Sequence, residues 1–409
     1  MSASGEILRI AAKGDGITAD GRFVHGAAPG DMLLADGSLE HGPHHIAPAC
    51  RHFGTCGGCQ LQQLDEASLS RFVAERVAER VANAAAGQGL ESGLIAAPQL
   101  SPPQSRRRVA LRAESNSGRV TLGFREGRSH KLVDLAECPV MLPELAALIQ
   151  PIRKLLARAF QQMDRGGRLA ADIELAAVEQ GVDVAIKGLS VEGLAATEAM
   201  LDFAREFGLA RLTLDQGYGA EALWEPEPVT VAMGGISVAY PPGAFIQATQ
   251  HGEAALIAAA RDWLAGAGAI ADLFSGLGTF AFALAGPGTK LLAAEAAREA
   301  HLACKAAADR SGLPIHSLHR DLFRNPLDAG ELNRFDAVLL DPPRAGAREQ
   351  IARLAESKVG RVVYISCNPS SWSRDAATLV AGGYRLSELR PVGQFRWSTH
   401  VELASLFVR

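Results

Sequence analysis

The sequence has little of several features that mark specialised classes of protein. Only six of its 409 residues are cysteine and 6% are aromatic, too few cysteines for a disulfide-stapled scaffold. It lacks any run of the ~18 apolar residues that a membrane-spanning helix needs, and residues 1–10 lack the basic-then-apolar order of a secretory signal. These absences predict a cytoplasmic protein that does not enter a membrane.

The chain also lacks the overall positive charge of a uniformly basic nucleic-acid-binding protein, since its net charge is -4. The charge is uneven, however, because residues 101–131 hold eight basic and two acidic residues and are net +6. A solvated basic face explains such a cluster as well as a phosphate-binding stripe does. The candidate phosphate contacts are Arg106, Arg107, Arg108 and Arg112.

Length and a hydrophobic content of 48% predict two or three packed domains. Residues 5–36 contain short β segments broken by Gly and Asp turns, the pattern of a small barrel. Leu69 to Ala86 has helical spacing. Residues 105–135 alternate as strands, and 171–228 mix strands with a helix near 195–207, which predicts an α+β central domain.

From about Val238 onward the pattern changes to regular alternation of helix and strand. This alternation predicts an α/β domain with a doubly wound, mostly parallel sheet and helices on both faces. Ligands of such sheets bind beyond the carboxyl ends of the strands. The expected helices are 250–263, 280–285, 298–311 and 348–356, and the expected strands are 269–274, 290–294, 337–340, 362–366 and 401–408.

A glycine loop in this domain predicts a cofactor site. Gly276 and Gly278 follow a strand and open a helix, so a ligand can approach the backbone N–H groups closely. Glu295, 19 residues after Gly276, is placed to bind ribose hydroxyls of either NAD or S-adenosylmethionine. The next strand end, Asp341-Pro-Pro-Arg344, resembles the substrate-facing motif of methyltransferases and favours S-adenosylmethionine, although Asp341 could simply cap a helix.

Cys367 ends the expected strand 362–366 and therefore lies at the same sheet edge as the glycine loop. A single strand-end cysteine is more often a packing residue. Glu402 changes that interpretation, because it is a carboxylate in an otherwise apolar final strand. If that strand runs antiparallel beside 362–366, Glu402 lies near Cys367 and could act as its base.

Three of the remaining cysteines fall within ten residues, at Cys50, Cys56 and Cys59, and Cys138 is a candidate fourth ligand. Four thiolates suit zinc or an iron–sulfur cluster equally well, and spacing alone does not decide between them. Cys304 lies in an expected helix and is interpreted as a packing residue.

Taken together, the motifs resemble one family, the RNA (uracil-5-)-methyltransferases. The resemblance is closest to the iron–sulfur-containing bacterial 23S rRNA (uracil-5-)-methyltransferases with a TRAM module, an OB-like RNA-binding barrel. It covers nearly the whole chain, through FGTCGGCQLQQL, SRRRVALR, GFREGRSHKLVDLAECP, PPGAFIQATQ, DLFSGLGTF, LLDPPRAGA, YISCNPSSWSRD and THVELASLF.

The resemblance implies three domains: a truncated TRAM-like β module (1–45), a central RNA-binding domain with an iron–sulfur loop (46–235), and a Rossmann-like class I methyltransferase domain (236–409). It also implies a [4Fe-4S] cluster on the four clustered cysteines, Cys367 as nucleophile and Glu402 as base. The implied contacts with S-adenosyl-L-methionine are Gln247, Phe274, Thr279, Glu295, Asp321 and Asp341.

Two positions depart from the family pattern. Thr249 stands where the family usually has Asn two residues after the Gln of its Phe-x-Gln motif, and Thr279 replaces a frequent Asn in the cofactor loop. Both threonines keep hydrogen-bonding capacity, so we expect activity to survive. Thr249 and Arg344 are further candidate RNA contacts.

The family chemistry explains why a thiol is needed. Carbon 5 of uracil is a poor nucleophile, and a thiolate that adds to carbon 6 makes carbon 5 reactive. This requires an accessible cysteine in surroundings that favour the thiolate. We expect a monomer that methylates a uridine splayed or flipped from a structured RNA, and the expected RNA is 23S rRNA. The alternatives are a tRNA-directed enzyme, an NAD-linked iron–sulfur oxidoreductase and a non-catalytic RNA-binding protein.

Overall fold

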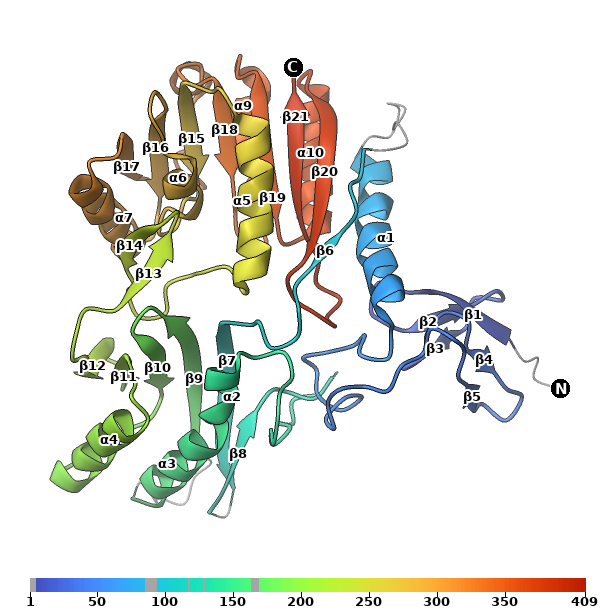
Figure 1. Ribbon diagram of the computed structural model, residues 1–409, viewed down its shortest axis with the longest axis vertical. Helices are drawn as coiled ribbons and strands as arrows, with labels where there is room; N and C mark the ends of the chain where they lie inside the picture. The colour runs from blue at the N-terminus through green and yellow to red at the C-terminus, as the bar shows by residue number, and fades with distance from the viewer. Residues whose placement is uncertain (1–4, 85–93, 117, 128, 163–168) are drawn as a thin grey trace. The chain divides into compact units, whose positions relative to one another are not determined.

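The computed structural model describes residues 5–84, 94–116, 118–127, 129–162 and 169–409, drawn as a ribbon in Figure 1. The chain divides into two compact units, and neither is continuous in sequence. Unit 1 contains residues 1–69, 102–229 and 395–399, and unit 2 contains residues 70–101, 230–394 and 400–409. This division differs from the three contiguous domains expected, because residues 70–101 join the methyltransferase-like unit and 395–399 leave it.

The first sheet of unit 1 is built from short antiparallel strands in the order β3-β2-β1-β4-β5. Buried Asp31 joins the segment before β4 to the segment after β5, because its carboxylate accepts hydrogen bonds from the backbone N–H groups of Ala28 and Gly42. The prediction of short β segments over 5–36 is confirmed. The strands are β1 (Gly5–Ile10), β2 (Gly16–Thr18), β3 (Phe23–Val24), β4 (Met32–Leu33) and β5 (Leu39–Glu40).

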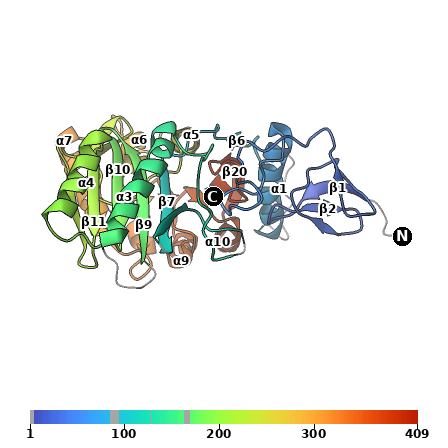
Figure 2. The same ribbon diagram turned by 90° about the horizontal axis from the view of Figure 1, so that it is seen from below.

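The second sheet of unit 1 has six strands within the described residues, in the order β12-β11-β10-β9-β7-β8. Helices α3 and α4 contact each other and pack against it, burying Leu156 and Phe203 (Figure 2). The elements are β7 (Arg108–Asn116), β8 (Arg119–Gly123), α2 (Pro143–Ala147), α3 (Ile149–Gln162), β9 (Leu169–Val178), β10 (Gly181–Lys187), α4 (Leu194–Glu206), β11 (Arg211–Asp215) and β12 (Ala220–Trp224).

Unit 2 is organised on an eight-stranded sheet, counted over the described residues, in the order β17-β16-β15-β18-β19-β21-β20-β6. Of these eight strands, seven run parallel to one another, and the eighth, β21, runs antiparallel between β19 and β20. The strands are β6 (Gln99–Leu100), β15 (Ala269–Leu273), β16 (Lys290–Glu295), β17 (Ile315–His319), β18 (Ala337–Leu340), β19 (Arg361–Ser366), β20 (Arg385–Gly393) and β21 (Glu402–Val408).

Helices cover both faces of this sheet, as the alternation of the sequence predicted. Figure 2 shows α5 and α6 on one side of β20, and α9 and α10 on the other. A hairpin of β13 (Thr230–Met233) and β14 (Ile236–Ala239) packs on α6 and α7. The helices are α5 (Gln250–Leu264), α6 (Thr279–Leu284), α7 (Arg298–Ser311), α8 (Ala329–Leu332), α9 (Arg348–Glu356) and α10 (Pro369–Ala381).

Helix α1 (Glu66–Ala84) begins in unit 1 and continues in unit 2. It matches the helix predicted for residues 69–86. The last two positions of that prediction, 85 and 86, lie outside the described residues. Its apolar stripe of Val73, Val77 and Val81 is buried, as the helical spacing required. Of the helices in the described part of the chain, none is long and apolar enough to cross a membrane.

Candidate active site

The parallel strands of unit 2 carry the predicted site residues to one edge of the sheet. Phe274 follows β15, Glu295 ends β16, Asp341 follows β18 and Cys367 follows β19. The register aligns them, because Leu273 lies opposite Ala294 on one side and Leu340 on the other. Carboxyl ends of parallel strands form the ligand-binding edge in such sheets.

The glycine loop after β15 has the backbone conformation that its sequence required. Gly276 and Gly278 have φ of 56° and 92°, and Phe274 has a left-handed φ of 63°. A Cβ on Gly278 would lie 2.7 Å from Phe282 and 2.9 Å from the Cys304 sulfur. Glycine is therefore needed there for space as well as for conformation.

Glu295 supports this loop directly. One carboxylate oxygen accepts a hydrogen bond from the Gly276 N–H at 2.8 Å, and the other accepts one from the Ala297 N–H at 2.7 Å. Thr279 is the first residue of α6, and its hydroxyl lies 3.5 Å from the Met233 sulfur. Cys304 is buried on α7, as expected of a packing residue.

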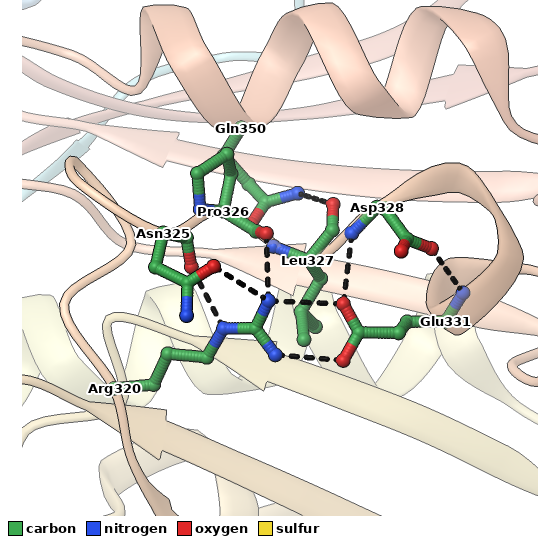
Figure 3. Close-up of polar contacts among 7 residues, drawn as sticks. All are labelled: Arg320, Asn325, Pro326, Leu327, Asp328, Glu331 and Gln350. Carbon is green, nitrogen blue, oxygen red and sulfur yellow. Dashed lines mark hydrogen bonds and ion pairs between the residues drawn. The ribbon is translucent and has the colours of Figure 1, made fainter.

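The loop after β17 carries Asp321, which accepts hydrogen bonds from the backbone N–H groups of Phe323 and Arg324. Its neighbour Arg320 anchors this loop: the guanidinium makes a bidentate ion pair with Glu331 and donates to the carbonyl of Pro326 (Figure 3). Bidentate pairs of this type fix orientation as well as charge.

The register between β19 and β21 places Cys367 and Glu402 at matching ends of adjacent strands. Ser366 pairs with Leu403 in the antiparallel ladder, so the next residue on each strand, Cys367 and Glu402, comes opposite the other. The charge of the Glu402 carboxylate raises the pKa of the Cys367 thiol. The predicted antiparallel last strand is confirmed.

The surroundings of Cys367 do not favour the thiolate, contrary to the expectation from sequence. Burial, followed by the nearby carboxyl groups of Glu402 and Asp341, raises the pKa of the thiol to about 11, and Arg344 opposes the rise. Desolvation and like charge both disfavour an anion. The half-buried thiol does lie next to the N-terminus of α10, which favours negative charge.

The two carboxyl groups at this edge are also perturbed. Burial raises the pKa of Glu402 to about 7, against hydrogen bonding by Gln394 and the charge of Arg344. The pKa of Asp341 is raised by burial and then by Glu402 and Asp272. Glu402 therefore gains and loses a proton near neutral pH, as a general base must.

Arg344 is held beside the thiol by backbone contacts. The side-chain amide of Asn368 donates to the Arg344 carbonyl at 3.0 Å, which ties the turn after β19 to the turn after β18. Buried Asp375 reinforces the second turn, since it accepts hydrogen bonds from the Ala347 N–H and the Tyr364 hydroxyl. Arg344 itself is exposed and contacts His400, so it remains available to a ligand.

Gln247 and Thr249, which precede α5, are both buried. Gln247 donates a hydrogen bond to Asp341 at 2.9 Å and accepts one from Gln394 at 3.0 Å. Thr249 caps α5 by accepting from the Gly252 N–H and also contacts the Ser101 hydroxyl. Its side chain is thus used as a buried helix cap. Gln394 was not identified from the sequence, because no local pattern marks it.

The predicted arginine stripe in unit 1 is only partly exposed. Residues of β7 alternate between the two faces of the sheet, and Arg107 falls in the buried set with Val109. Arg106 is turned into a pocket, where its guanidinium lies 5.4 Å from the Phe395 ring centre. Arg107 is therefore buried, contrary to the expectation of a phosphate contact, whereas Arg106 is partly exposed and stays a predicted contact.

Arg108 and Arg112 project from the other face of β7 and are partly exposed. Arg108 pairs with Glu174 at 3.6 Å, and Arg112 pairs with Asp172 at 2.8 Å. Exposed ion pairs of this kind contribute little and can exchange partners. Of the basic window, Arg128 lies outside the described residues.

The four clustered cysteines, Cys50, Cys56, Cys59 and Cys138, line the same pocket of unit 1 as Arg106. All four are free thiols. The Cys50 sulfur accepts a hydrogen bond from the His52 N–H, and the Cys56 sulfur accepts one from the Gly58 N–H, both at 3.4 Å. Burial raises the pKa of Cys59 to about 12, and the other three thiols add to the rise.

Within the described residues, no three His, Cys, Asp or Glu side chains converge tightly enough to hold a single metal ion. A zinc ion needs its thiolates ~2.3 Å from one centre. The pocket thus gathers four thiols around a shared space without the closeness of a zinc site.

Comparison with known proteins agrees with this architecture. The fold matches the crystal structure of the Pyrococcus abyssi tRNA (uracil-54, C5)-methyltransferase in complex with S-adenosyl-L-homocysteine, with a TM-score of 0.74 at 22% identity, over 99% of this chain and 100% of that one. The model of the family described as tRNA (Uracil-5-)-methyltransferase matches residues 319–409.

Sequence relatives extend over most of the chain. It is 47% identical over 404 residues to an uncharacterized RNA methyltransferase of Zymomonas mobilis, covering 99% of each chain. It is 33% identical over 376 residues to the 23S rRNA (uracil(1939)-C(5))-methyltransferase of Pectobacterium atrosepticum, covering 90% of this chain and 81% of that protein.

Fold and sequence together define an S-adenosylmethionine-dependent class I methyltransferase. Within that class, the chain belongs to the RNA (uracil-5-)-methyltransferase family. This membership favours the methyltransferase interpretation over the NAD-linked oxidoreductase that the glycine loop alone had left open.

Proposed function

We propose that this enzyme methylates carbon 5 of a specific uridine in 23S rRNA, with Cys367 as the covalent nucleophile and Glu402 as the base. The observation that carries the proposal is the pairing of β19 with β21, which sets the half-buried thiol opposite a buried carboxyl group at the cofactor edge. A buried cysteine by itself could be a packing residue, and a carboxyl group by itself could be an ordinary residue of an edge strand. Their juxtaposition suits nucleophilic catalysis.

The residues at this edge fit S-adenosyl-L-methionine. A Cβ on Gly276 would meet nothing within 4 Å, so a ligand can approach the backbone there, and Glu295 and Asp321 offer carboxylate oxygens. When bound, the cofactor supplies an electrophilic methyl group. The residues that would hold it are Gln247, Phe274, Thr279, Glu295, Asp321 and Asp341.

The chain's own residues supply the remaining chemistry. The Cys367 sulfur adds to carbon 6 of the uracil ring, which makes carbon 5 nucleophilic. Once carbon 5 carries the methyl group, the Glu402 carboxylate takes its proton and the Cys367 sulfur leaves carbon 6. Because the pKa of the thiol is about 11 in the free protein, Arg344 and the N-terminus of α10 must stabilise the thiolate as the substrate binds.

Substitutions at the two residues distinguish the steps. We expect Cys367→Ala to abolish methyl transfer to 23S rRNA, and Glu402→Gln to accumulate a covalent protein–RNA complex that survives denaturing electrophoresis. Cys304→Ala is the control, because it removes a buried thiol outside the site. Undiminished 5-methyluridine formation by Cys367→Ala would overturn the mechanism.

The choice of 23S rRNA rests on the Pectobacterium relative at 33% identity and on the TRAM-like strands β1–β5. A tRNA substrate is the second candidate, favoured by the fold match to the Pyrococcus enzyme. Mass-spectrometric mapping of 5-methyluridine in both RNA classes from a deletion strain separates them. Loss of the modification from tRNA alone would reject the rRNA assignment.

RNA contacts are proposed for Arg108, Arg112 and Arg344, which are partly or fully exposed, with Thr249 acting indirectly through the cap of α5. Phosphate contacts of this type weaken as salt rises. We expect Arg112→Gln to lower affinity for RNA uniformly across sequences and to reduce the slope of affinity against salt.

We also propose that Cys50, Cys56, Cys59 and Cys138 hold a [4Fe-4S] cluster. The donor set fits, because four thiols share one pocket and are too widely placed for a single ion, while a four-iron cluster is larger. Buried neighbouring thiols resist ionisation, so they need a cationic centre to become thiolates.

Iron and sulfide content tests this assignment. We expect anaerobically purified protein to contain four irons per chain, and Cys59→Ser to lose most of them together with the visible charge-transfer absorbance. Cys304→Ser serves as the control. One zinc per chain, or full iron retention by Cys59→Ser, would contradict the proposal.

A further inference from the structure

A buried chain of amide groups in unit 2 connects the two sides of the proposed site, and this inference rests on the proposed role of Glu402 as base. Gln247, Gln394 and Glu402 are each no more than 4% exposed. Gln394 lies directly after β20, between the last residue of that strand and the segment that leads to β21. Gln394 is not one of the reacting residues. It nevertheless contacts side chains on the cofactor side and on the base side of the site.

One backbone donor determines the direction of the hydrogen bonds that link Gln394, Gln247 and Asp341. The Ala248 N–H can only donate, and it lies 3.1 Å from the Gln394 Oε1. The Gln394 Nε2 must therefore be the group that faces the Gln247 Oε1 at 3.0 Å. Gln247 consequently presents its own Nε2 to the Asp341 carboxyl at 2.9 Å.

Gln394 also lies near the base, because Val392, two residues before it, pairs with Glu402 in the ladder between β20 and β21. Glu402 accepts a side-chain hydrogen bond from Gln394, and this bond opposes the rise in the Glu402 pKa that burial causes. An amide nitrogen has two protons, so one Gln394 side chain serves Gln247 and Glu402 at once. A buried donor to a carboxylate favours its ionised form.

Helix α5 holds the Gln394 side chain in place. A Cβ built on Gly252 would lie 2.6 Å from the Gln394 Cβ and 2.8 Å from its Oε1. The helix backbone therefore approaches the amide as closely as a glycine permits. Gly252 also donates to the cap residue Thr249, so the cap and the amide chain share one turn of helix.

We propose that Gln394 is a positioning residue that orients Glu402 as the base and, through Gln247, aligns Asp341 on the cofactor side of the same site. It acts through Glu402 and Gln247 and takes part in no bond-making step itself. Its action is to hold the carboxylate of Glu402 ionised near neutral pH and to keep the Gln247 amide in the orientation that donates to Asp341.

The first test replaces the amide with an apolar side chain of similar length. In Gln394→Met, we expect the titration midpoint of Glu402 to rise by about one pH unit, since a hydrogen bond to a charged group is lost. Carbon-13 carboxyl NMR measures this midpoint directly, and Glu402→Gln identifies the signal by its disappearance. An unchanged midpoint would overturn the inference.

The same variant has two functional readouts. Release of tritium from RNA labelled at uridine carbon 5 is expected to slow by about fivefold at pH 7 and to recover at higher pH. Affinity for S-adenosyl-L-methionine, measured by calorimetry, is expected to fall because Gln247 loses the donor that orients it. Gln63→Met, another buried glutamine, is the control and should lower thermal stability without moving either value.

Gly252→Ala provides a second route that removes no polar group. Alanine favours the helix by about 1 kcal/mol relative to glycine, so loss of fold is not expected, yet its Cβ must displace the Gln394 side chain. We expect the Glu402 midpoint to rise as in Gln394→Met. If wild-type protein transfers no methyl group to RNA, the proposed function fails, while the midpoint shift still decides the role of Gln394.

Discussion

At the scale of single residues, environment determines the chemistry more than residue type does. Cys367 and Cys304 are both partly or fully buried thiols of raised pKa. Cys304 packs inside a helix layer, whereas Cys367 ends a strand beside a carboxyl group and an arginine. Glu402 is comparably unusual, because burial brings its pKa to about 7, where a carboxyl group can both accept and release a proton.

The raised pKa of Glu402 predicts the pH dependence of the last chemical step. A carboxyl group that acts as a base must be ionised, so its activity is lost as pH falls through the folded-state pKa. We expect tritium release from a covalent complex formed at low pH, and then shifted to a series of higher pH values, to rise about tenfold per pH unit below about 7 and to level off above it. A rate independent of pH between 5 and 8 would exclude Glu402 as the base.

Gly278 permits a test of the cofactor loop. Gly278→Ala meets both an unfavourable φ and a clash with Phe282 and Cys304, so we expect affinity for S-adenosyl-L-methionine to fall at least tenfold in calorimetry. Gly288→Ala is the matched control, since Gly288 has a similar φ of 85° but open space around it. Equal affinities of the two variants would show that the clash has no effect.

At the scale of elements, the strongly periodic segments follow the predicted pattern, and the weakly patterned ones do not. Helices α5, α7 and α9 lie within one residue of the expected ranges. β17, β20, α8 and α10 were not anticipated. β17 mixes apolar residues with His and Ser without alternation, and α8 is a single turn. Such short or mixed segments become regular through pairing and packing with neighbours.

The six-stranded sheet of unit 1 contains a buried ion pair that predicts a large stability effect. Arg211 and Asp183 lie on adjacent strands with both side chains 4% exposed and 2.7 Å apart. Arg211→Met leaves the Asp183 carboxyl buried without its partner, so we expect the free energy of unfolding to fall by about 3–5 kcal/mol. Urea denaturation measures this difference.

Two further variants make that prediction specific. Lys187→Met breaks a partly exposed pair with Glu174 in the same sheet and should cost less than about 1 kcal/mol. The double change Asp183→Leu with Arg211→Met should regain most of the loss, because no charge is left uncompensated. A single-variant loss no greater than that of Lys187→Met would refute the explanation.

At the scale of the whole molecule, each unit is assembled from distant parts of the sequence. Residues 70–101 complete unit 2, since β6 pairs with β20 and the Ala96 N–H donates to the Leu389 carbonyl. The Ser373 hydroxyl also donates to the Arg80 carbonyl. The methyltransferase fold therefore extends beyond its expected start at 236.

This assembly predicts how fragments behave. Residues 230–409 alone would expose the edge of β20 and the apolar surface that α1 covers, and exposed edges promote aggregation. We expect this fragment to aggregate in size-exclusion chromatography, and a fusion of residues 70–101 to it through a flexible linker to be monomeric with a sharper thermal transition. A cooperative, monomeric 230–409 fragment would show that residues 70–101 are dispensable.

The sequence by itself determined the fold class, the glycine loop, the clustered cysteines, and the placing of Cys367 and Glu402 on neighbouring strands. These depend on local backbone preferences and on a regular strand order. Only the tertiary structure decided that Arg107 is buried, that Thr249 is a buried cap and that Gln394 lies between Gln247 and Glu402. Such contacts depend on which side chains burial brings together from distant segments, and no local spacing encodes them.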